Sequence, residues 1–278
     1  MTLLIILISL VGLYDQDGPA FKSASGVVVD PPDRPCPSAW CDSLYTVTTL
    51  YDSASATTYQ LTEIKAANIQ LKMAIANQVE GETGTEFVKR MGCCIAFNGS
   101  MGIKNLPNGV RQPVGIQIVD GKIIQDLRTK RYTLGIKENN QLVCYPPEYT
   151  AADILKDGTD FALTAFTPLI QNHRPVSMEI LKTVPNQLLK HPRQAIAQYD
   201  NGNILVLSCG GRGFGGEGMT TLDLIRIFSE LDVRFAFNLD GGGSTTTILN
   251  GKRITPLIDN KGTVERPRPN WLYVACEQ

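Results

Sequence analysis

The sequence predicts an α+β fold, a mixed α/β arrangement in which a large mixed β-sheet core carries a few flanking helices. Short apolar runs bounded by Gly, Pro, Asn and Asp recur along the chain, which is typical of strands joined by tight turns. Turn signals at Asp120-Gly121, Asn201-Gly202 and Asn250-Gly251 each lie between two such runs and predict hairpins. Few segments have helical periodicity, so strands dominate.

The expected elements follow from the same signals in chain order. Helices are predicted at residues 85–91, with Thr85 as a candidate cap, and at residues 221–231, where Thr220 is followed three residues on by Asp223. Strands are predicted at residues 44–50, 69–76, 93–97, 114–124, 140–147, 161–170, 193–209, 233–239, 245–254 and 270–276, several of these ranges being hairpins. The chain shows no internal repeat.

Composition excludes two classes of protein. The formal net charge is −1, so the basic surplus typical of nucleic-acid binders is missing. With 43% hydrophobic residues the chain is also unlike a disordered one. Its 278 residues are enough to bury a sizeable core.

The first 43 residues form a separate segment, and residues 44–278 form the main domain. Residues 2–13 are apolar but too short to span a bilayer, and no Lys or Arg precedes them as in a secretory signal. Two interpretations stay open: a buried strand or a segment that docks on a partner protein, and a retained signal or membrane anchor. Residues 14–43 are rich in Gly, Pro, Asp and Ser and predict an irregular extension.

The seven cysteines do not form a regular framework, because their number is odd and their spacing irregular. Cys36 and Cys41 flank a proline-containing loop and could form a local disulfide. Four further cysteines lie in apolar strands and are expected to be buried thiols: Cys93, Cys144, Cys209 and Cys276. There is no CxxC pair and there are only two histidines, so no structural zinc site is expected.

A glycine fingerprint at residues 211–216 (GRGFGG) satisfies G-x-G-x-x-G, and Asp240 closes the next strand. A dinucleotide site is nevertheless disfavoured. Gly218, Met219 and Thr220 still precede the helix, and only hairpins follow where further βαβ units are needed. No cofactor is therefore expected.

The segment that carries chemistry is residues 238–245 (NLDGGGST). A buried strand delivers Asp240, and Gly241, Gly242 and Gly243 let the backbone approach a ligand and point N–H groups at it, with Ser244 and Thr245 adjoining. This pattern suits a charged or oxygen-rich substrate. The simpler interpretation is a tight turn in which Asp240 caps its own loop. Asp240 and Asn238 could also hold Ca²⁺, but no ligand loop requires it and no metal is predicted.

The ordered set of motifs resembles the phosphodiester glycosidase family over about residues 44–276. Residues 191–197 (HPRQAIA) are similar to the family's P-R-T-A-I-G strand, and residues 218–220 (GMT) to the start of its G-M-T-L-x-E-L segment. Residues 265–270 (ERPRPN) resemble its E-R-P-x-x-N strand, and residues 97–100 (FNGS) with 113–115 (PVG) its N-G-G-F-F…P-x-G half.

The resemblance implies the family's fold for the main domain and hydrolysis of a sugar-1-phosphodiester at the anomeric bond. The substrate would be a GlcNAc-phosphodiester or a cell-surface glycopolymer. Asp240 is the expected nucleophile or charge stabiliser and Glu265 the second carboxylate, with Glu217 a weaker option. The expected substrate contacts are the loop from Gly241 to Thr245, the sugar-binding residues Asn98 and Gly99, and the phosphate-binding residues Arg193, Arg212 and Arg266.

Several positions depart from the family pattern and bear on substrate identity. Ser100-Met101 replaces the family's usual Gly-Phe or Ser-Phe, so the aromatic residue beside Asn98 is missing; Gln194 replaces Thr and Ala197 replaces Gly. The alternative function is a non-catalytic carbohydrate-binding or structural module of an extracellular or virion tail assembly. In either case an extracellular, cell-envelope or virion-associated location is expected.

Overall fold

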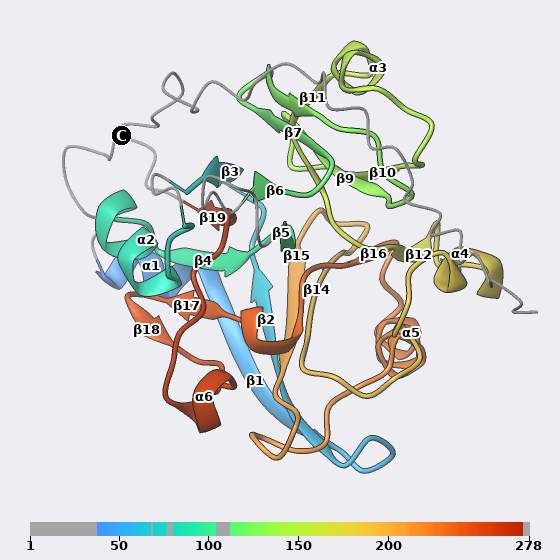
Figure 1. The fold of residues 1–278 in the computed structure, drawn as a ribbon. Helices are drawn as coiled ribbons and strands as arrows, with labels where there is room; N and C mark the ends of the chain where they lie inside the picture. Colours follow the sequence, from blue (N-terminus) through green and yellow to red (C-terminus); the bar gives the residue numbers. More distant parts are fainter. Residues whose placement is uncertain (1–37, 68, 77–79, 104–111, 275–278) are drawn as a thin grey trace, which may run out of the picture.

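The computed structural model describes residues 38–67, 69–76, 80–103 and 112–274 (Figure 1). Three sheets of seven, five and five strands and a two-stranded ribbon make up the fold, with short helices at their edges. The α+β class is confirmed. Three sheets take the place of the one large sheet that was expected. Within each of them, neighbouring strands pair antiparallel.

The central sheet has seven strands in the order β1-β2-β15-β14-β16-β12-β13. Three pairs of consecutive strands are joined through contacts between strands that are far apart in the sequence, β2 with β15, β14 with β16 and β16 with β12, so strands from both ends of the domain meet here. The strands are β1 (Tyr45–Asp52), β2 (Thr57–Ile64), β15 (Ile204–Cys209), β14 (Arg193–Gln198), β16 (Phe235–Asn238), β12 (Pro168–Gln171) and β13 (Arg174–Pro175).

The other two sheets have five strands each. The second has the order β10-β9-β11-β7-β8, with β10 (Leu142–Tyr145), β9 (Thr133–Lys137), β11 (Thr159–Thr164), β7 (Ile116–Val119) and β8 (Lys122–Asp126). The third has the order β18-β17-β4-β19-β3, with β18 (Lys252–Arg253), β17 (Thr247–Leu249), β4 (Ile95–Asn98), β19 (Asn270–Val274) and β3 (Leu71–Ile75). The ribbon pairs β5 (Gly102–Ile103) with β6 (Gln112–Pro113).

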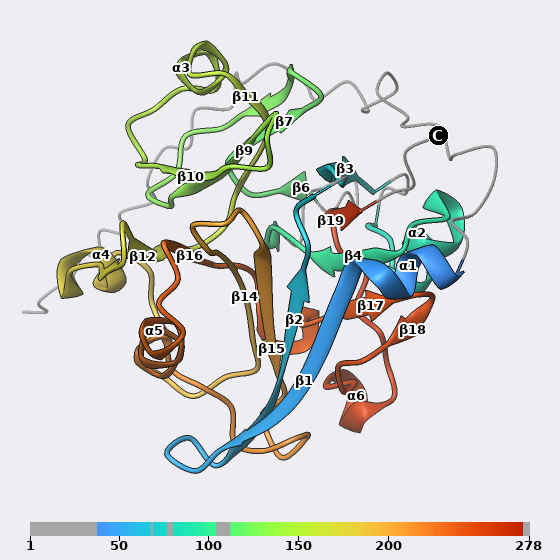
Figure 2. The same ribbon diagram turned by 180° about the vertical axis from the view of Figure 1, so that it is seen from behind.

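The helices are α1 (Ser38–Leu44), α2 (Gly84–Met91), α3 (Ala151–Lys156), α4 (Met178–Lys182), α5 (Thr221–Glu230) and α6 (Asp259–Gly262), with a 3₁₀ turn η1 (Gly242–Ser244). Helix α5 covers one face of the central sheet and the third sheet lies across the other (Figures 1 and 2). No helix within the described ranges is long and apolar enough to cross a bilayer.

The inner strands of the central sheet, β14, β15 and β16, are buried along their whole length because the sheet is covered on both faces. In β14, Ile196 packs with residues of all three sheets, whereas Ala195 and Ala197 pack under α5 with Leu224 and Phe228. A strand buried on one face would alternate apolar and polar residues, and β14 and β15 do not.

Most predicted turns and caps are found, with two differences. The three Asx-Gly hairpins join β7 to β8, β14 to β15 and β17 to β18. Thr220 and Asp223 form a capping box on α5 as predicted. Helix α2, however, is capped by Thr83 with Glu86, not by Thr85. The β1–β2 hairpin extends to Ile64, beyond the predicted strand. Its second strand was not predicted, because the turn at residues 53–56 lacks an Asx-Gly signal.

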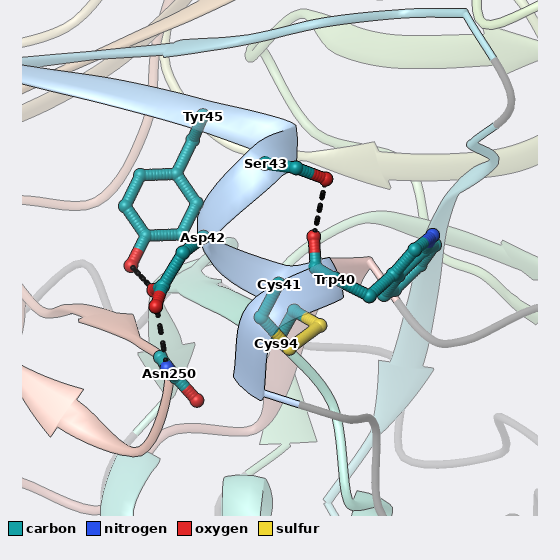
Figure 3. The surroundings of a disulfide bond; sticks show 7 residues. All are labelled: Trp40, Cys41, Asp42, Ser43, Tyr45, Cys94 and Asn250. Atoms are coloured by element: carbon teal, nitrogen blue, oxygen red, sulfur yellow. Dashed lines mark hydrogen bonds between the residues drawn. A yellow bond between two sulfur atoms is a disulfide. The ribbon is translucent and has the colours of Figure 1, made fainter.

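Cys41 is bonded to Cys94, so the expected local disulfide between Cys36 and Cys41 is wrong (Figure 3). The bond fixes α1 to the residue just before β4, and Asn250 donates a hydrogen bond to Asp42 beside it. The backbone Cα atoms of the pair are 5.2 Å apart. Cys36, Cys276 and the apolar residues 2–13 lie outside the described residues.

The free thiols are largely buried, as expected from their apolar neighbours. Cys93 and Cys209 are buried and Cys144 is partly exposed. Burial raises the pKa of Cys93 and Cys209 to about 12, and it also raises the pKa of Cys144. These groups therefore stay as thiols at neutral pH and have a packing role.

Removing the Cys41–Cys94 bond is expected to cost about 4 kcal/mol of unfolding free energy, because the bond closes a loop with a sequence separation of 53. Urea unfolding of the double Cys41→Ala and Cys94→Ala variant measures this. The control is Cys93→Ala, which removes a neighbouring free thiol and should cost about 1 kcal/mol. A double variant no less stable than the control contradicts the prediction.

Candidate active site

The site forms where a strand of the central sheet and a strand of the third sheet end side by side. The Asp240 N–H, two residues beyond β16, donates to the Gly99 carbonyl just beyond β4 at 3.1 Å. Asn98 Nδ2 donates to the Asp240 carbonyl at 2.6 Å, and its Oδ1 accepts from the Thr246 N–H at 2.9 Å. Two segments predicted separately are thus joined through one amide side chain. Asn98 is fully buried, so its amide positions Asp240 instead of facing solvent.

The Asp240 carboxylate is buried and held by one arginine. Its Oδ2 lies 3.0 Å from Nη2 of Arg268, and the two residues are 6% and 2% exposed. Arg268 is fixed by backbone pairing with Glu82 and donates to the Ser100 carbonyl at 3.4 Å. The sequence pattern pointed to Arg266 and gave no sign of Arg268. The two arginines have different carboxylate partners, because Arg266 pairs with Asp259 and Arg268 with Asp240, and no local pattern in the sequence distinguishes them.

The glycines after Asp240 are required by close packing. A β-carbon on Gly241 would overlap the Pro192 carbonyl oxygen, which accepts a hydrogen bond from the Gly242 N–H at 2.8 Å. Gly242 also has a φ of +66°, a region that favours glycine. Ser244 and Thr245 follow in the 3₁₀ turn and are buried. Thr245 Oγ1 is buried without a hydrogen-bond partner among the described residues.

The third glycine, Gly243, packs on an ion pair that the sequence motifs did not single out. Arg266 donates to both carboxylate oxygens of Asp259, at 2.5 and 2.6 Å, and to Ser244 Oγ at 3.3 Å. Arg266 therefore lies at the loop as predicted, with its guanidinium shared between Asp259 and Ser244. Asp259 lies seven residues before Arg266, between the motifs that marked the site and outside each of them.

Substituting Gly243 by Ala is expected to lower the unfolding free energy by about 1–3 kcal/mol, because the new methyl group would overlap Asp259 and Arg266. Urea unfolding measures the loss. Gly121→Ala is the control: a β-carbon there meets nothing within 4 Å, so only backbone strain at φ +66° remains. A Gly243→Ala variant as stable as the native chain contradicts the packing described.

Arg212 is the exposed cation of the site. It lies in the glycine-rich loop after β15, and a β-carbon on Gly242 would be 3.3 Å from its Nη2. The loop folds back on itself, with hydrogen bonds from Gly211 to Phe214 and from Gly213 to Gly216. Antiparallel strands surround it, unlike the parallel sheet of a dinucleotide fold. The glycine fingerprint therefore presents Arg212 to the Asp240 loop.

Arg193 is engaged elsewhere. It is 5% exposed, and its guanidinium donates to the backbone carbonyls of Met219, Asn186, Gln187 and Leu189. Burial lowers the pKa of Arg193 to about 10. All these partners belong to the chain itself, so the predicted phosphate contact is replaced by a role in holding these loops against β14.

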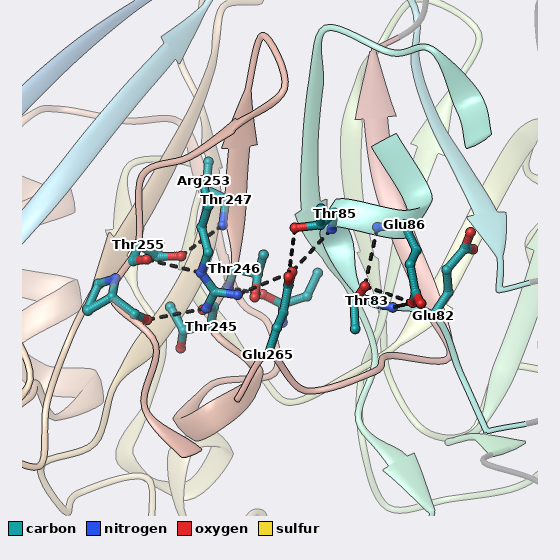
Figure 4. Close-up of polar contacts among 12 residues, drawn as sticks. Glu82, Thr83, Thr85, Glu86, Thr245, Thr246, Thr247, Arg253, Thr255 and Glu265 are labelled. Carbon is teal, nitrogen blue, oxygen red and sulfur yellow. Dashed lines mark hydrogen bonds and ion pairs between the residues drawn. The ribbon is translucent and has the colours of Figure 1, made fainter. Parts of the chain in front are cut away.

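Glu265 is also engaged in a structural network (Figure 4). Its carboxylate lies 3.2 Å from Nη1 of Arg253 and accepts hydrogen bonds from the Thr85 N–H and hydroxyl. Arg253 in turn donates to the Thr245 carbonyl at 3.0 Å. Glu265 thus ties the first turn of α2 to the end of the glycine loop. Glu217, the weaker candidate, is exposed and paired with Lys190.

His191 lies at the entrance to β14 and was not proposed from the sequence. Burial lowers the pKa of His191, and the charges of Arg193 and Arg212 lower it further. The imidazole is therefore neutral at pH 7, and its Nδ1 is buried without a hydrogen-bond partner in the described part of the chain. Among the described residues no three or more His, Cys, Asp and Glu side chains form a group that could hold a metal.

The site combines a buried carboxylate at a strand end with a close-packed glycine loop and arginines around it. These features suit an anionic, oxygen-rich ligand. The family model described as phosphodiester glycosidase matches residues 91–275. The chain belongs to the phosphodiester glycosidase family.

Solved structures support the family at the level of the fold. The catalytic domain of zebrafish N-acetylglucosamine-1-phosphodiester alpha-N-acetylglucosaminidase, auto-inhibited by its pro-peptide, superposes with a TM-score of 0.66 at 18% identity, over 84% of this chain and 82% of that one. A hypothetical protein from Synechocystis gives 0.59 at 14% identity, over 84% and 62%. A putative exported protein from Burkholderia pseudomallei K96243 gives 0.59 at 14% identity, over 79% and 74%.

A curated relative comes from a bacterial prophage. The SPbeta prophage-derived uncharacterized protein YomE of Bacillus subtilis (strain 168) is 30% identical over 184 residues. The match covers 64% of this chain but only 28% of the relative, so most of that protein has no counterpart here.

Proposed function

We propose that the protein hydrolyses a sugar-1-phosphodiester at the bond between the anomeric carbon and the phosphate oxygen. The observation that carries the proposal is the buried Asp240 carboxylate, which Arg268 holds by one oxygen beside the glycine loop. In this proposal the other carboxylate oxygen, Oδ1, faces the substrate. Family membership gives this geometry its chemical context.

In this mechanism Asp240 acts as nucleophile or as charge stabiliser at the anomeric carbon. The bond to the phosphate oxygen breaks with its electron pair moving to the leaving group, and positive charge develops on the sugar ring. Oδ1 either bonds to the anomeric carbon or stabilises that charge, and water completes hydrolysis. A phosphate ester leaves without being protonated, so a single carboxylate suffices and Glu265 is not needed as an acid.

Arg212 is the proposed phosphate contact from the predicted set, because its guanidinium lies over Gly242 and is exposed. The partly exposed backbone of Gly241 and Gly242 lines the sugar side in this proposal, whereas Ser244 and Thr245 are buried and support the loop. Asn98, Glu265 and Arg253 act as positioning residues, since they bind the backbone around Asp240 and Thr245. Gly99 contributes its carbonyl to the Asp240 N–H.

The test is release of N-acetylglucosamine from UDP-N-acetylglucosamine and from a panel of sugar-1-phosphodiesters and phosphate-linked cell-wall glycopolymers. Sugar release by the wild-type chain supports the proposal. A folded chain that releases no sugar from any of them contradicts it.

A second candidate function is a non-catalytic carbohydrate-binding or structural module of an extracellular or virion tail assembly. The prophage origin of a relative, of which this chain matches about a quarter, favours it. Both functions fit a location outside the cell or on a virion, as does the exported protein among the structural matches. Binding of a glycopolymer without turnover would separate the second function from the first.

A further inference from the structure

Arg131 is a half-buried cation that the mechanism above does not use. It precedes β9, and its guanidinium carbon lies 4.7 Å from the centre of the Phe166 ring. Nη1 donates to the Ala165 carbonyl at 3.5 Å, the one hydrogen bond that this side chain makes within the described structure. A guanidinium has five donors, so most of them stay free for a ligand.

Backbone hydrogen bonds fix Arg131 relative to the site. Tyr132, the next residue, donates to the Phe166 carbonyl at 3.1 Å and accepts from the Ala165 N–H at 3.2 Å. The same segment reaches both strand ends that frame Asp240. The Thr164 carbonyl accepts from Ser100 Oγ at 2.7 Å, and the Thr167 carbonyl accepts from the Asn238 N–H at 3.0 Å.

The segment that holds Arg131 contacts both strand ends that frame Asp240. Burial lowers the pKa of Arg131, and the negative charge of Asp240 opposes this by raising it. Arg131 stays cationic at neutral pH. Asp240 Oδ2 is engaged by Arg268, so Arg131 is a second cation, held by the segment that borders the site.

We propose that Arg131, stacked on Phe166, binds the phosphate of the leaving group and makes the site selective for anionic over neutral leaving groups. This inference rests on the proposed function and adds a specificity-determining residue to it. The guanidinium carbon lies over the aromatic ring, and a guanidinium can donate two parallel hydrogen bonds to phosphate oxygens. The cation would also stabilise the charge that builds up on the phosphate as the bond breaks.

The test compares two substrates with the same sugar and different leaving groups: UDP-N-acetylglucosamine and p-nitrophenyl α-N-acetylglucosaminide. Arg131→Gln is expected to lower kcat/KM about 50-fold for the phosphodiester and less than about threefold for the aryl glycoside. Arg131→Lys should recover only part of the loss, because an ammonium keeps the charge without the planar fork. If Arg131 acted only on Asp240 or on folding, Arg131→Gln would lower the rates for both substrates equally. That result overturns the inference.

Arg128→Gln is the matched control. Arg128 and Arg131 line the same small cavity of about 10 Å³, but Arg128 donates to the backbone carbonyls of Tyr149 and Glu148 at 3.1 and 3.0 Å. Removing it should leave both rates within about twofold. An Arg131→Gln variant that behaves like this control also overturns the inference.

The proposed function and this inference can fail separately. If the wild-type chain cleaves neither substrate, hydrolysis is wrong, and calorimetric titration of UDP-N-acetylglucosamine and free N-acetylglucosamine decides about Arg131. Weakening of about 50-fold by Arg131→Gln for the phosphodiester alone supports the contact. Equal affinities of the two chains, or no binding of the phosphodiester to the folded wild type, overturn it.

Discussion

Asp240→Asn is expected to lower turnover of a sugar-1-phosphodiester by at least about 10³-fold while the chain stays folded. In the proposed mechanism the carboxylate supplies the negative charge that faces the positive charge developing at the anomeric carbon. An amide neither attacks that carbon nor stabilises its charge comparably. The amide oxygen still accepts a hydrogen bond from Arg268 at the site of Oδ2, so the local geometry is retained.

The measurement is kcat on UDP-N-acetylglucosamine, with circular dichroism and urea unfolding to establish that the variant is folded. Glu217→Gln serves as the control, since that carboxylate is exposed and paired with Lys190. It should keep its activity within about twofold. A folded Asp240→Asn chain with more than a tenth of wild-type activity ends the assignment of Asp240.

Arg268→Met is expected to lower the unfolding free energy by about 3–5 kcal/mol, because it leaves the Asp240 carboxylate buried without its cation. Activity should fall as well, since Arg268 fixes Oδ2. Urea unfolding measures the stability. In the Asp240→Asn background the same substitution should cost at least about 1 kcal/mol less, because no buried negative charge is then left unpaired.

Arg266→Met, two residues away, is the control for that measurement. Its pair with Asp259 is about a quarter exposed on each side, and such pairs contribute only about 1 kcal/mol or less. Equal losses for Arg266→Met and Arg268→Met, or a loss unchanged by Asp240→Asn, would falsify the buried pair as the reason.

Much of the fold follows from local signals in the sequence. Asx-Gly turns form with positive φ at residues such as Asp120 and Gly121, whatever surrounds them. The capping box of α5 is equally local. The cap of α2 lies two residues before the predicted one. Thr83 and Glu86 have the spacing of a capping box, whereas Thr85 is followed three residues on by Val88, so this difference could be read from the sequence.

The candidate site was predicted in its motifs but only partly in its side chains. Asp240 and its glycine loop were predicted as a site. Three glycines in a row carry a cost in chain entropy, and that cost is offset where the backbone beside the acid must approach another group closely. The resemblance predicts Arg193 as a phosphate contact and Glu265 as the second carboxylate. In the structure, the Arg193 guanidinium donates to backbone carbonyls and the Glu265 carboxylate pairs with Arg253. Which groups a charged side chain meets depends on segments that the sequence places far away.

The class of the fold, its turns and the loop that carries the acid each depend on a few neighbouring residues and can be read from the sequence. Three contacts depend on the folded arrangement: Cys41 with Cys94, Arg268 and not Arg266 with Asp240, and Arg131 with Phe166. The reason is physical: in an antiparallel fold built from distant strands, side-chain partners are set by sheet order and register, which no local pattern encodes.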